Sequence, residues 1–184
     1  VGVYTITTDV HDLTVTQEKL RRSVERDALT DALSRHTMMS FIECSIADPN
    51  LEYALFFIDL DGFKAVNDEK GHHVGDRLLA DVASALRSAV RVEDAVGRFG
   101  GDEFLVLARV TGQAGAEALA EHLRVSIAAV AEAAGDQVSA SIGYALAPAD
   151  TRDSMQLLHH ADEAMYVAKR QGKNRAIPWV HAKG

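Results

Sequence analysis

Apolar residues follow two different spacings along this chain, and together the spacings predict a protein of mixed helices and strands. Residues 53–59 are apolar without alternation and end in an acidic residue, as expected of a strand covered on both faces of a sheet. Two short strands, over residues 95–99 and 104–109, are so close in sequence that they predict a hairpin. Residues 138–147 and 176–177 are the remaining predicted strands of the domain.

Helices are predicted wherever apolar positions recur three or four residues apart. These segments are residues 34–46, 63–68, 76–90, 115–134 and 154–170. Ser34 is the expected N-cap of the first helix, and a loop over residues 71–75 is expected before the third. The order of the elements, with the hairpin in the middle, predicts an α/β sandwich in which a mainly antiparallel sheet is flanked by helices.

The N-terminal residues have a different pattern from the rest. Residues 1–8 are rich in β-formers and predict one strand with no neighbour to pair with, which indicates a piece of a larger protein. Val10, Leu13, Leu20 and Val24 then fall on a heptad. This segment is either a linker helix that pairs with a second chain or a lone amphipathic helix packed on its own domain.

The chain has 184 residues and a formal net charge of −8. This length suits one globular domain, and the sequence has no apolar run long enough to span a membrane, so a soluble piece is expected. The acidity argues against non-specific binding to nucleic acid or anionic lipid, and any polyphosphate ligand would need local cations. The single cysteine, Cys44, excludes an intrachain disulfide and a cysteine-rich zinc site; it suits a reducing cytoplasm and is expected in the core.

Acidic residues gather at the ends of two predicted strands. Asp59 and Asp61 end the buried strand, and Asp102 and Glu103 lie at the tip of the hairpin. If these strands are adjacent, the four carboxylates repel one another and favour a hard divalent cation. Mg²⁺ or Mn²⁺ is favoured over Zn²⁺, which indicates a metal–nucleotide site. The alternative is a plain hairpin loop beside a strand-end cap.

Two further pairs of residues have the chemistry to bind a nucleotide. Asn67 and Asp76 flank the loop over residues 71–75 and can pair with a guanine edge, although each alone is also a plausible helix cap. Lys169 and Lys173 are four residues apart at a predicted helix end, so they are expected to share a face and reach a triphosphate. A solvated helix end that complements the helix dipole is the alternative for the lysines.

Together these residues resemble the GGDEF family of diguanylate cyclases, whose name is spelled by residues 100–104. Four more segments are similar to family motifs in the same order: Asp27-Ala-Leu-Thr30, residues 57–68, residues 71–76, and residues 161–169 followed by Gly172-Lys173-Asn174. Five ordered motifs are far more specific than one short pattern. The resemblance implies a ferredoxin-like fold with the palm-like sheet of nucleotidyl cyclases and polymerases, over residues 27–180.

The resemblance also implies the reaction: two GTP condense into cyclic di-GMP with release of two pyrophosphates, in a homodimer whose two sites face each other. It implies that Asp59, Asp102, Glu103 and the Leu60 carbonyl bind Mg²⁺ or Mn²⁺, and that Asp102 is the candidate base for the attacking 3′-hydroxyl. The metal would neutralise the triphosphate and hold the displacement in line, leaving the protein mainly to position groups.

By the same resemblance, Asn67 and Asp76 recognise guanine, His72 lines the nucleotide pocket, and Lys169 and Lys173 hold the phosphates. The implied substrate contacts also include Phe63, Lys64, Gly100 and Gly101.

A possible regulatory site precedes the hairpin. Arg91 and Asp94 form an Arg-x-x-Asp sequence ahead of the Gly-Gly-Asp-Glu loop, where many family members have an inhibitory site for the product. The resemblance thus implies feedback inhibition by cyclic di-GMP. The alternative is an ordinary surface ion pair, which contributes little to stability.

Three positions depart from the usual motifs. Asp31 stands where the family has glycine, which puts the geometry of that loop in question because glycine reaches positive φ more readily. Ser34 replaces an asparagine, and Lys173 replaces an arginine, which weakens only bidentate phosphate recognition.

The segment before the domain is similar to the end of a PAS sensor, with a remnant strand over residues 1–9 and a signalling helix over residues 10–26. The expected location is cytoplasmic, although a longer protein could be membrane-anchored. One rival to a cyclase is a catalytically silent module that binds GTP or cyclic di-GMP. Another is a cyclase that makes mixed dinucleotides, against which Asn67 and Asp76 argue modestly.

Overall fold

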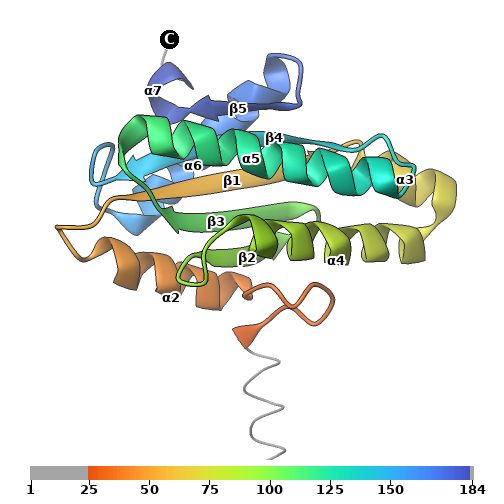
Figure 1. Cartoon of the computed structure of the whole chain (residues 1–184), viewed down its shortest axis with the longest axis horizontal. Coiled ribbons are helices and arrows are strands. Elements are labelled where there is room, and N and C mark those ends of the chain that lie inside the picture. Colours follow the sequence, from red (N-terminus) through yellow and green to blue (C-terminus); the bar gives the residue numbers. More distant parts are fainter. Residues whose placement is uncertain (1–24, 183–184) are drawn as a thin grey trace, which may run out of the picture.

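The computed structural model describes residues 25–182, so the strand and heptads predicted before Glu25 lie outside the described residues. Five strands form one sheet in the order β2-β3-β1-β4-β5 (Figure 1). The strands are β1 (Tyr53–Asp61), β2 (Ala95–Gly100), β3 (Glu103–Arg109), β4 (Ser139–Ala147) and β5 (Arg175–Pro178). The central strand β1 is antiparallel to both β3 and β4, whereas β5 is parallel to β4. The predicted hairpin and the mainly antiparallel sheet are therefore confirmed.

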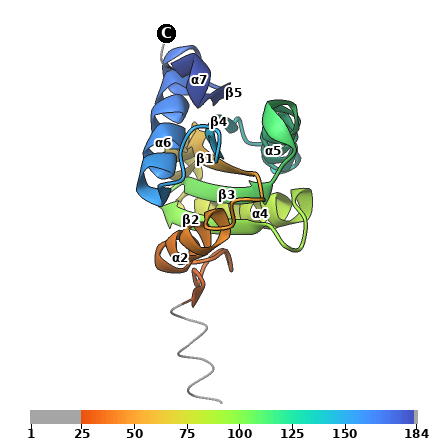
Figure 2. The same cartoon turned by 90° about the vertical axis from the view of Figure 1, so that its left-hand side faces the viewer.

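Helices cover both faces of this sheet. They are α2 (Arg35–Ile46), α3 (Phe63–Lys70), α4 (His72–Ala89), α5 (Gly112–Ala133), α6 (Ser154–Arg170) and the short α7 (Trp179–Ala182). Viewed along the sheet, α4 and α5 lie on one side of the strands and α6 lies on the other (Figure 2). The predicted sandwich is confirmed, and α7 is an additional element that the sequence pattern did not predict.

The two faces of β1 supply two separate cores, because successive side chains of a strand point in opposite directions. Phe56 and Ile58 pack into the cluster under α4 and α5, whereas Leu55 and Phe57 pack into the cluster under α2 and α6. Every residue of β1 after Tyr53 is buried, as its continuous apolar pattern predicts. Asp59 and Asp61 therefore share the face that is covered by α6.

Helix α6 packs directly against the backbone of β4 at Gly143. A Cβ atom at this position would collide with the Ala161 carbonyl oxygen and the Met165 backbone nitrogen. The absence of a side chain thus lets the helix approach the strand closely. This approach brings the C-terminal turn of α6 to the edge of the sheet where β1 ends.

Two expectations about helices are wrong in detail. The segment expected to be a loop before Asp76 is already helical, because Gly71, with φ of 87°, separates α3 from a helix that begins at His72. Cys44 is exposed rather than in the core. The buried stripe of α2 consists of Met38, Ile42 and Ile46, and Cys44 lies off that stripe.

The loop over residues 27–33 accommodates the unusual Asp31. Its φ is 55°, so the residue occupies the left-handed conformation that a glycine adopts most readily. Aspartate is among the few other residues that visit this region. The loop closes with a hydrogen bond from the Asp31 amide to the Asp27 carbonyl. The position therefore requires positive φ, as the comparison with the family motif suggested.

Among residues 25–182, none of the helices is both long and apolar enough to cross a membrane.

Candidate active site

The register of the sheet brings the two predicted acidic segments together. Asp59 near the end of β1 lies directly opposite Glu103 at the start of β3. The Leu60 amide donates a hydrogen bond to the Asp102 carbonyl oxygen at 3.3 Å, which joins the hairpin tip to β1. Residues that are distant in sequence thus form one acidic edge, as predicted, and we refer to Asp59, Asp102 and Glu103 as the acidic triad.

The carboxyl groups of the acidic triad are close enough to shift one another's pKa values. Burial, and next the charge of Asp59, raise the pKa of Asp102 above its ordinary value. Burial also raises the pKa of Glu103, followed by the charges of Asp59, Asp102 and Asp162. An added cation would relieve this repulsion, so the site favours binding of positive charge.

One cation within the protein already contacts the acidic triad. Lys169 Nζ lies 2.7 Å from Asp59 Oδ2, and the Asp59 side chain is only 11% exposed. Although burial disfavours the charged lysine, its hydrogen bond to Asp59 raises the pKa of Lys169 overall. Lys169 therefore lies at the acidic edge, a position that the sequence analysis did not predict, and it neutralises part of the negative charge there.

The donor set of this edge suits a hard divalent ion. Carboxylate and carbonyl oxygens are the preferred ligands of Mg²⁺, and the triad with the Leu60 carbonyl offers only oxygen. Within the described part of the chain, no group of three or more His, Cys, Asp or Glu side chains is already arranged to hold a metal ion. The residues therefore fit Mg²⁺ or Mn²⁺ in chemistry.

Asp61 does not join the acidic triad. Its carboxylate accepts hydrogen bonds from the hydroxyl groups of Ser141 and Ser139 and from the Asn174 amide. It is buried, with 7% of its surface exposed. The structure thus assigns Asp61 to anchoring β4 and the turn before β5, a role that its position next to Asp59 in the sequence did not indicate.

Lys173 does not share a helix face with Lys169, contrary to the prediction. Helix α6 ends at Arg170, and Lys173 lies in the following turn with φ of 64°. Its amide donates to the Ala168 carbonyl, and it is exposed. The anchoring of neighbouring Asn174 by Asp61 holds this turn beside the end of β1. The two lysines are thus presented by different elements.

The predicted guanine-binding residues come from α3 and the first turn of α4. A Cβ atom on Gly75 would collide with Asn67 Oδ1 and approach Phe63 Cζ to 3.1 Å, so these helices touch at this glycine. Asn67 Oδ1 is buried and accepts no hydrogen bond among the described residues. Asp76, next to Gly75, is exposed. His72 begins α4 and Lys64 lies on α3, and both are exposed.

The hairpin tip has an irregular backbone. Gly101 has φ of 43°, in the left-handed region, and the ladder of β2 and β3 is irregular between Arg98 and Gly100. A Cβ atom on Gly101 would meet no heavy atom within 4 Å. The space around the tip is therefore open, and conformation rather than crowding favours glycine there.

Arg91 and Asp94 lie at the opposite end of the sheet from the acidic triad. Both line a cavity of about 690 Å³ together with Arg109, which pairs with Tyr53 at the start of β1. The Asp94 carboxylate accepts hydrogen bonds from the Arg91 and Arg109 amides, both at 2.9 Å. The motif therefore caps a turn and borders a cavity.

The described chain matches known proteins over most of its length. Residues 24–175 match the family described as "Diguanylate cyclase, GGDEF domain". The chain is 36% identical over 178 residues to diguanylate cyclase DgcM of Escherichia coli (strain K12), which covers 91% of this chain and 42% of DgcM. It is 38% identical over 172 residues to cyclic di-GMP phosphodiesterase PdeR of the same strain, which covers 91% of this chain and 26% of PdeR. The chain thus spans less than half the length of either relative.

A solved structure has the same fold. It is a microbial GGDEF domain described for a novel interaction mode with cyclic di-GMP, and its TM-score to this protein is 0.76 at 29% sequence identity. The match covers 86% of this chain and 99% of that one. Sequence, fold and the arrangement of the acidic triad agree, and the chain belongs to the GGDEF family of diguanylate cyclase domains.

Proposed function

We propose that this domain is an active, Mg²⁺-dependent diguanylate cyclase that condenses two GTP into cyclic di-GMP and two pyrophosphates as a homodimer. The observation that carries the proposal is the complete acidic triad, which the register of β1 and β3 assembles at one edge beside an unaltered Gly-Gly-Asp-Glu-Phe loop. Replacement of Asp59, Asp102 or Glu103 by a neutral residue would have argued for a module without catalysis.

The reaction makes two identical bonds. The 3′-oxygen of each GTP bonds to the α-phosphorus of the other, the bond to pyrophosphate breaks, and the hydroxyl proton passes to a base. Asp102 is the proposed base, and burial together with the charge of Asp59 raises the pKa of its carboxyl group, which makes it a better proton acceptor. Bound Mg²⁺ would neutralise the triphosphate and lower the pKa of the attacking hydroxyl.

The other residues bind and orient GTP. The buried Asn67 Oδ1, which lacks a partner among the described residues, and the exposed Asp76 are proposed to pair with guanine donors beside His72. Lys169 and Lys173 are proposed to contact phosphates, with Phe63, Lys64, Gly100 and Gly101 lining the substrate. A carboxylate that accepts from guanine would find no matching donors on adenine, so GTP is preferred over ATP.

Product inhibition is a second part of the proposal. Arg91 and Asp94 border a cavity that lies at the far end of β1 from the acidic triad, so a bound dinucleotide would not compete directly with GTP. The similar microbial GGDEF domain is described with cyclic di-GMP. A preceding sensor and signalling helix, within or before residues 1–24, would set how often two domains meet in the cytoplasm.

A silent module that binds GTP or cyclic di-GMP is the second candidate. The observation that favours it is the 38% identity to PdeR, which is named as a phosphodiesterase rather than a cyclase. The presence of all three acidic residues of the triad argues against this second candidate.

The test is to incubate the domain with GTP and Mg²⁺ over a range of protein concentrations and to separate the products by chromatography. Cyclic di-GMP should form at a rate that rises more steeply than linearly with protein concentration. Asp102→Asn should lower this rate by about 100-fold or more, as expected for loss of a general base. No product at any concentration, with cyclic di-GMP still bound, would support the silent module. A mixture of GTP and ATP should yield no mixed dinucleotide.

A further inference from the structure

We infer that Arg98 is a positioning residue that sets the backbone of the catalytic hairpin and couples it to the loop over residues 27–33, the N-terminal loop. Arg98 belongs to β2 and is not part of the acidic triad. The expected effect of Arg98 on turnover rests on the proposed function. The contact that Arg98 makes joins two separate segments of the chain. One segment carries Asp102, and the other leads into helix α2.

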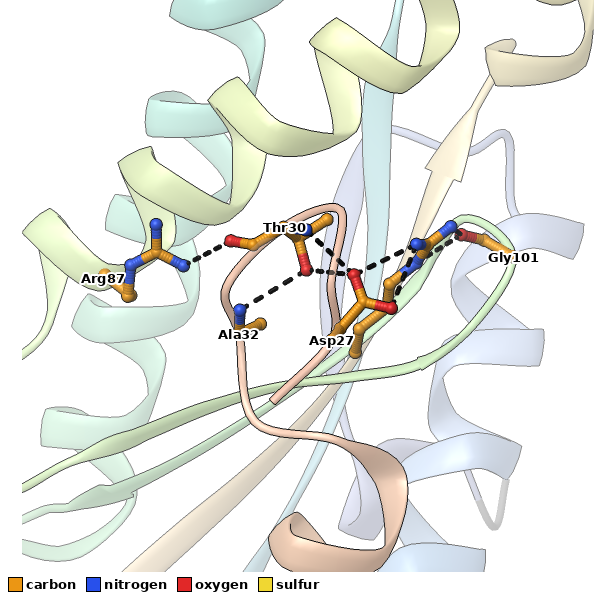
Figure 3. A network of polar contacts seen from close by, with 6 residues as sticks. Asp27, Thr30, Ala32, Arg87 and Gly101 are labelled. Carbon is orange, nitrogen blue, oxygen red and sulfur yellow. Dashed lines mark hydrogen bonds and ion pairs between the residues drawn. The ribbon is translucent and has the colours of Figure 1, made fainter. Parts of the chain in front are cut away.

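The guanidinium group of Arg98 contacts both segments, at the Gly101 carbonyl and at the Asp27 carboxylate. Figure 3 labels Gly101 and Asp27. Its Nε and Nη2 atoms donate to the Gly101 carbonyl oxygen at 3.0 and 2.8 Å. Its Nη1 atom lies 3.2 and 3.3 Å from the two carboxylate oxygens of Asp27. The planar fork of arginine suits this arrangement, because one edge binds the carbonyl while the remaining nitrogen faces the carboxylate.

The contact with Arg98 holds one side of the hairpin tip. Gly101 directly precedes Asp102, and no heavy atom lies near the position of a Gly101 Cβ atom. The Asp102 carbonyl is held from the other side by the Leu60 amide at 3.3 Å. A shift of the Gly101 carbonyl would therefore move the Asp102 carboxylate, and displacements of about 1 Å at a reacting group can reduce rates about 100-fold.

The N-terminal loop in turn fixes the position of Asp27. Asp27 Oδ1 accepts hydrogen bonds from the Thr30 amide at 2.9 Å and the Thr30 hydroxyl at 2.7 Å. Burial opposes ionisation of Asp27, but these bonds and the contact with Arg98 lower its pKa overall. The Thr30 carbonyl accepts from Arg87 Nη1 at 2.8 Å, which ties the loop to α4 (Figure 3).

The backbone supports the same connection. The Leu33 amide donates to the Val96 carbonyl and the Arg98 amide donates to the Leu33 carbonyl, both at 2.9 Å. The end of the N-terminal loop is therefore hydrogen-bonded to the edge strand β2. Asp27 and Arg98 are only 26% and 17% exposed, so solvent screens their pairing incompletely. A displacement of the chain at Glu25 would therefore reach Gly101 through two side chains, Asp27 and Arg98.

The test compares Arg98→Lys with a matched control, Arg26→Lys. Arg26 directly precedes the N-terminal loop. Its Nη1 atom donates to the Asp31 carbonyl at 2.6 Å and lies 3.6 Å from the Asp31 carboxylate, so both of these side-chain contacts are made to the N-terminal loop. Lysine keeps the charge and loses the fork. Arg98→Lys should lower kcat by about 10- to 100-fold and change KM for GTP by less than about threefold, whereas Arg26→Lys should leave both within about twofold.

A second readout does not require turnover. Hydrogen exchange of the amides of residues 100–103 should become about 10-fold faster in Arg98→Lys and remain unchanged in Arg26→Lys, because only the former frees the tip. If the wild-type domain makes no cyclic di-GMP, the proposed function fails, and exchange alone decides the inference. Unchanged exchange in Arg98→Lys, or an equal loss of kcat in both variants, overturns it.

The coupling to the loop is tested with Asp27→Asn, which keeps an oxygen for Thr30 and removes the charge that faces Arg98. If Asp27 acts through Arg98, the double variant should show no greater loss of kcat, and no faster exchange, than Arg98→Lys alone. Losses that multiply in the double variant would show that Asp27 acts independently, and the proposed route from the loop to the hairpin would be wrong.

Discussion

Lys169 Nζ lies 2.7 Å from Asp59 Oδ2, so the last turn of α6 is joined to the end of the central strand by a partly buried ion pair. The pair brings a cation to the acidic triad without help from any ligand. It also explains how an acidic chain keeps three neighbouring carboxylates at one edge of its sheet, because the lysine offsets part of their repulsion.

Lys169→Met should destabilise the metal-free domain by about 1–2 kcal/mol, since the mostly buried Asp59 carboxylate would lose its counter-ion. The double variant Asp59→Asn with Lys169→Met should recover part of this loss, because neither charge remains without its partner. Urea unfolding in the presence of a chelator measures both. Lys64→Met, at an exposed position of α3, is the control and should change stability by less than about 0.5 kcal/mol. Additive losses in the double variant would contradict the pairing.

Asp102→Asn should stabilise the metal-free domain at pH 7, although it should lower the rate of turnover by about 100-fold or more. Burial and Asp59 raise the pKa of Asp102 in the folded state above its unfolded value of 3.8. The ordinary aspartate therefore contributes its full stability only below pH 3.8 and loses it as the pH rises through the raised pKa. At pH 7 the asparagine variant should melt higher than the wild type, by a small margin because solvent partly screens the charge of this incompletely buried carboxyl group.

The difference in melting temperature should shrink as the pH is lowered through the raised pKa of Asp102, and it should vanish below 3.8, where Asp102 is protonated in both states. Millimolar Mg²⁺ should raise the melting temperature of the wild type more than that of Asp102→Asn, because bound cation relieves the same repulsion. A variant that melts lower than the wild type at pH 7, or a difference that is independent of pH, would argue against crowding at the acidic triad.

Much of the fold was predictable from sequence because its signals are local. The unbroken apolar run of β1, the N-cap Ser34 and the spacing of the hairpin each determine an element by nearby residues alone, and the structure confirms them. The start of α4 was not predictable in this way. The segment with Gly71 and Gly75 suggested a loop. In the structure Gly71 alone ends α3, and Gly75 lies inside α4, where the lack of a side chain leaves room for Asn67 of α3.

The sequence predicted the residues of the site where a motif specifies their types. It did not predict how tertiary contacts give similar residues different roles. Asp59 and Asp61 look equivalent in sequence, yet of the two only Asp59 forms an ion pair with Lys169, whereas Asp61 accepts hydrogen bonds from β4 and the turn before β5. Arg98 likewise has no signal of its own in the sequence. Its importance depends on Asp27, which is 71 residues away and is brought near by the Leu33 bridge to β2.

Asp61→Ala should destabilise the domain by about 2–3 kcal/mol, because it removes the acceptor of several hydrogen bonds and leaves the buried Ser141 hydroxyl without its partner. Ser139→Ala is the matched comparison. The Ser139 hydroxyl bond to Asp61 is longer, at 3.3 Å, and this substitution should reduce stability by less than about 1 kcal/mol. Chemical unfolding measures both effects. Equal losses for the two variants would show that Asp61 is not the centre of this network.

Gly75→Ala and Gly115→Ala should have opposite effects, although both glycines are the fourth residue of a helix. A methyl group on Gly115 would meet Val110 Cβ at 3.8 Å, an ordinary contact, so the variant should gain about 0.5–1 kcal/mol from helix propensity. A methyl group on Gly75 would displace the Asn67 side chain and crowd Phe63. Overpacking of this kind should reduce stability by about 1 kcal/mol or more.

The same pair of variants separates packing from recognition of the base. If Asn67 pairs with guanine, Gly75→Ala should raise KM for GTP about 10-fold, since a polar contact to the bound nucleotide is lost, and should leave kcat within about threefold. Gly115→Ala should leave KM unchanged. Steady-state kinetics and thermal unfolding of both variants check this. Were Gly75→Ala to stabilise the domain as much as Gly115→Ala and leave KM unaltered, the close contact between α3 and α4 would not position Asn67, and guanine recognition would have to come from Asp76 and the first turn of α4 alone.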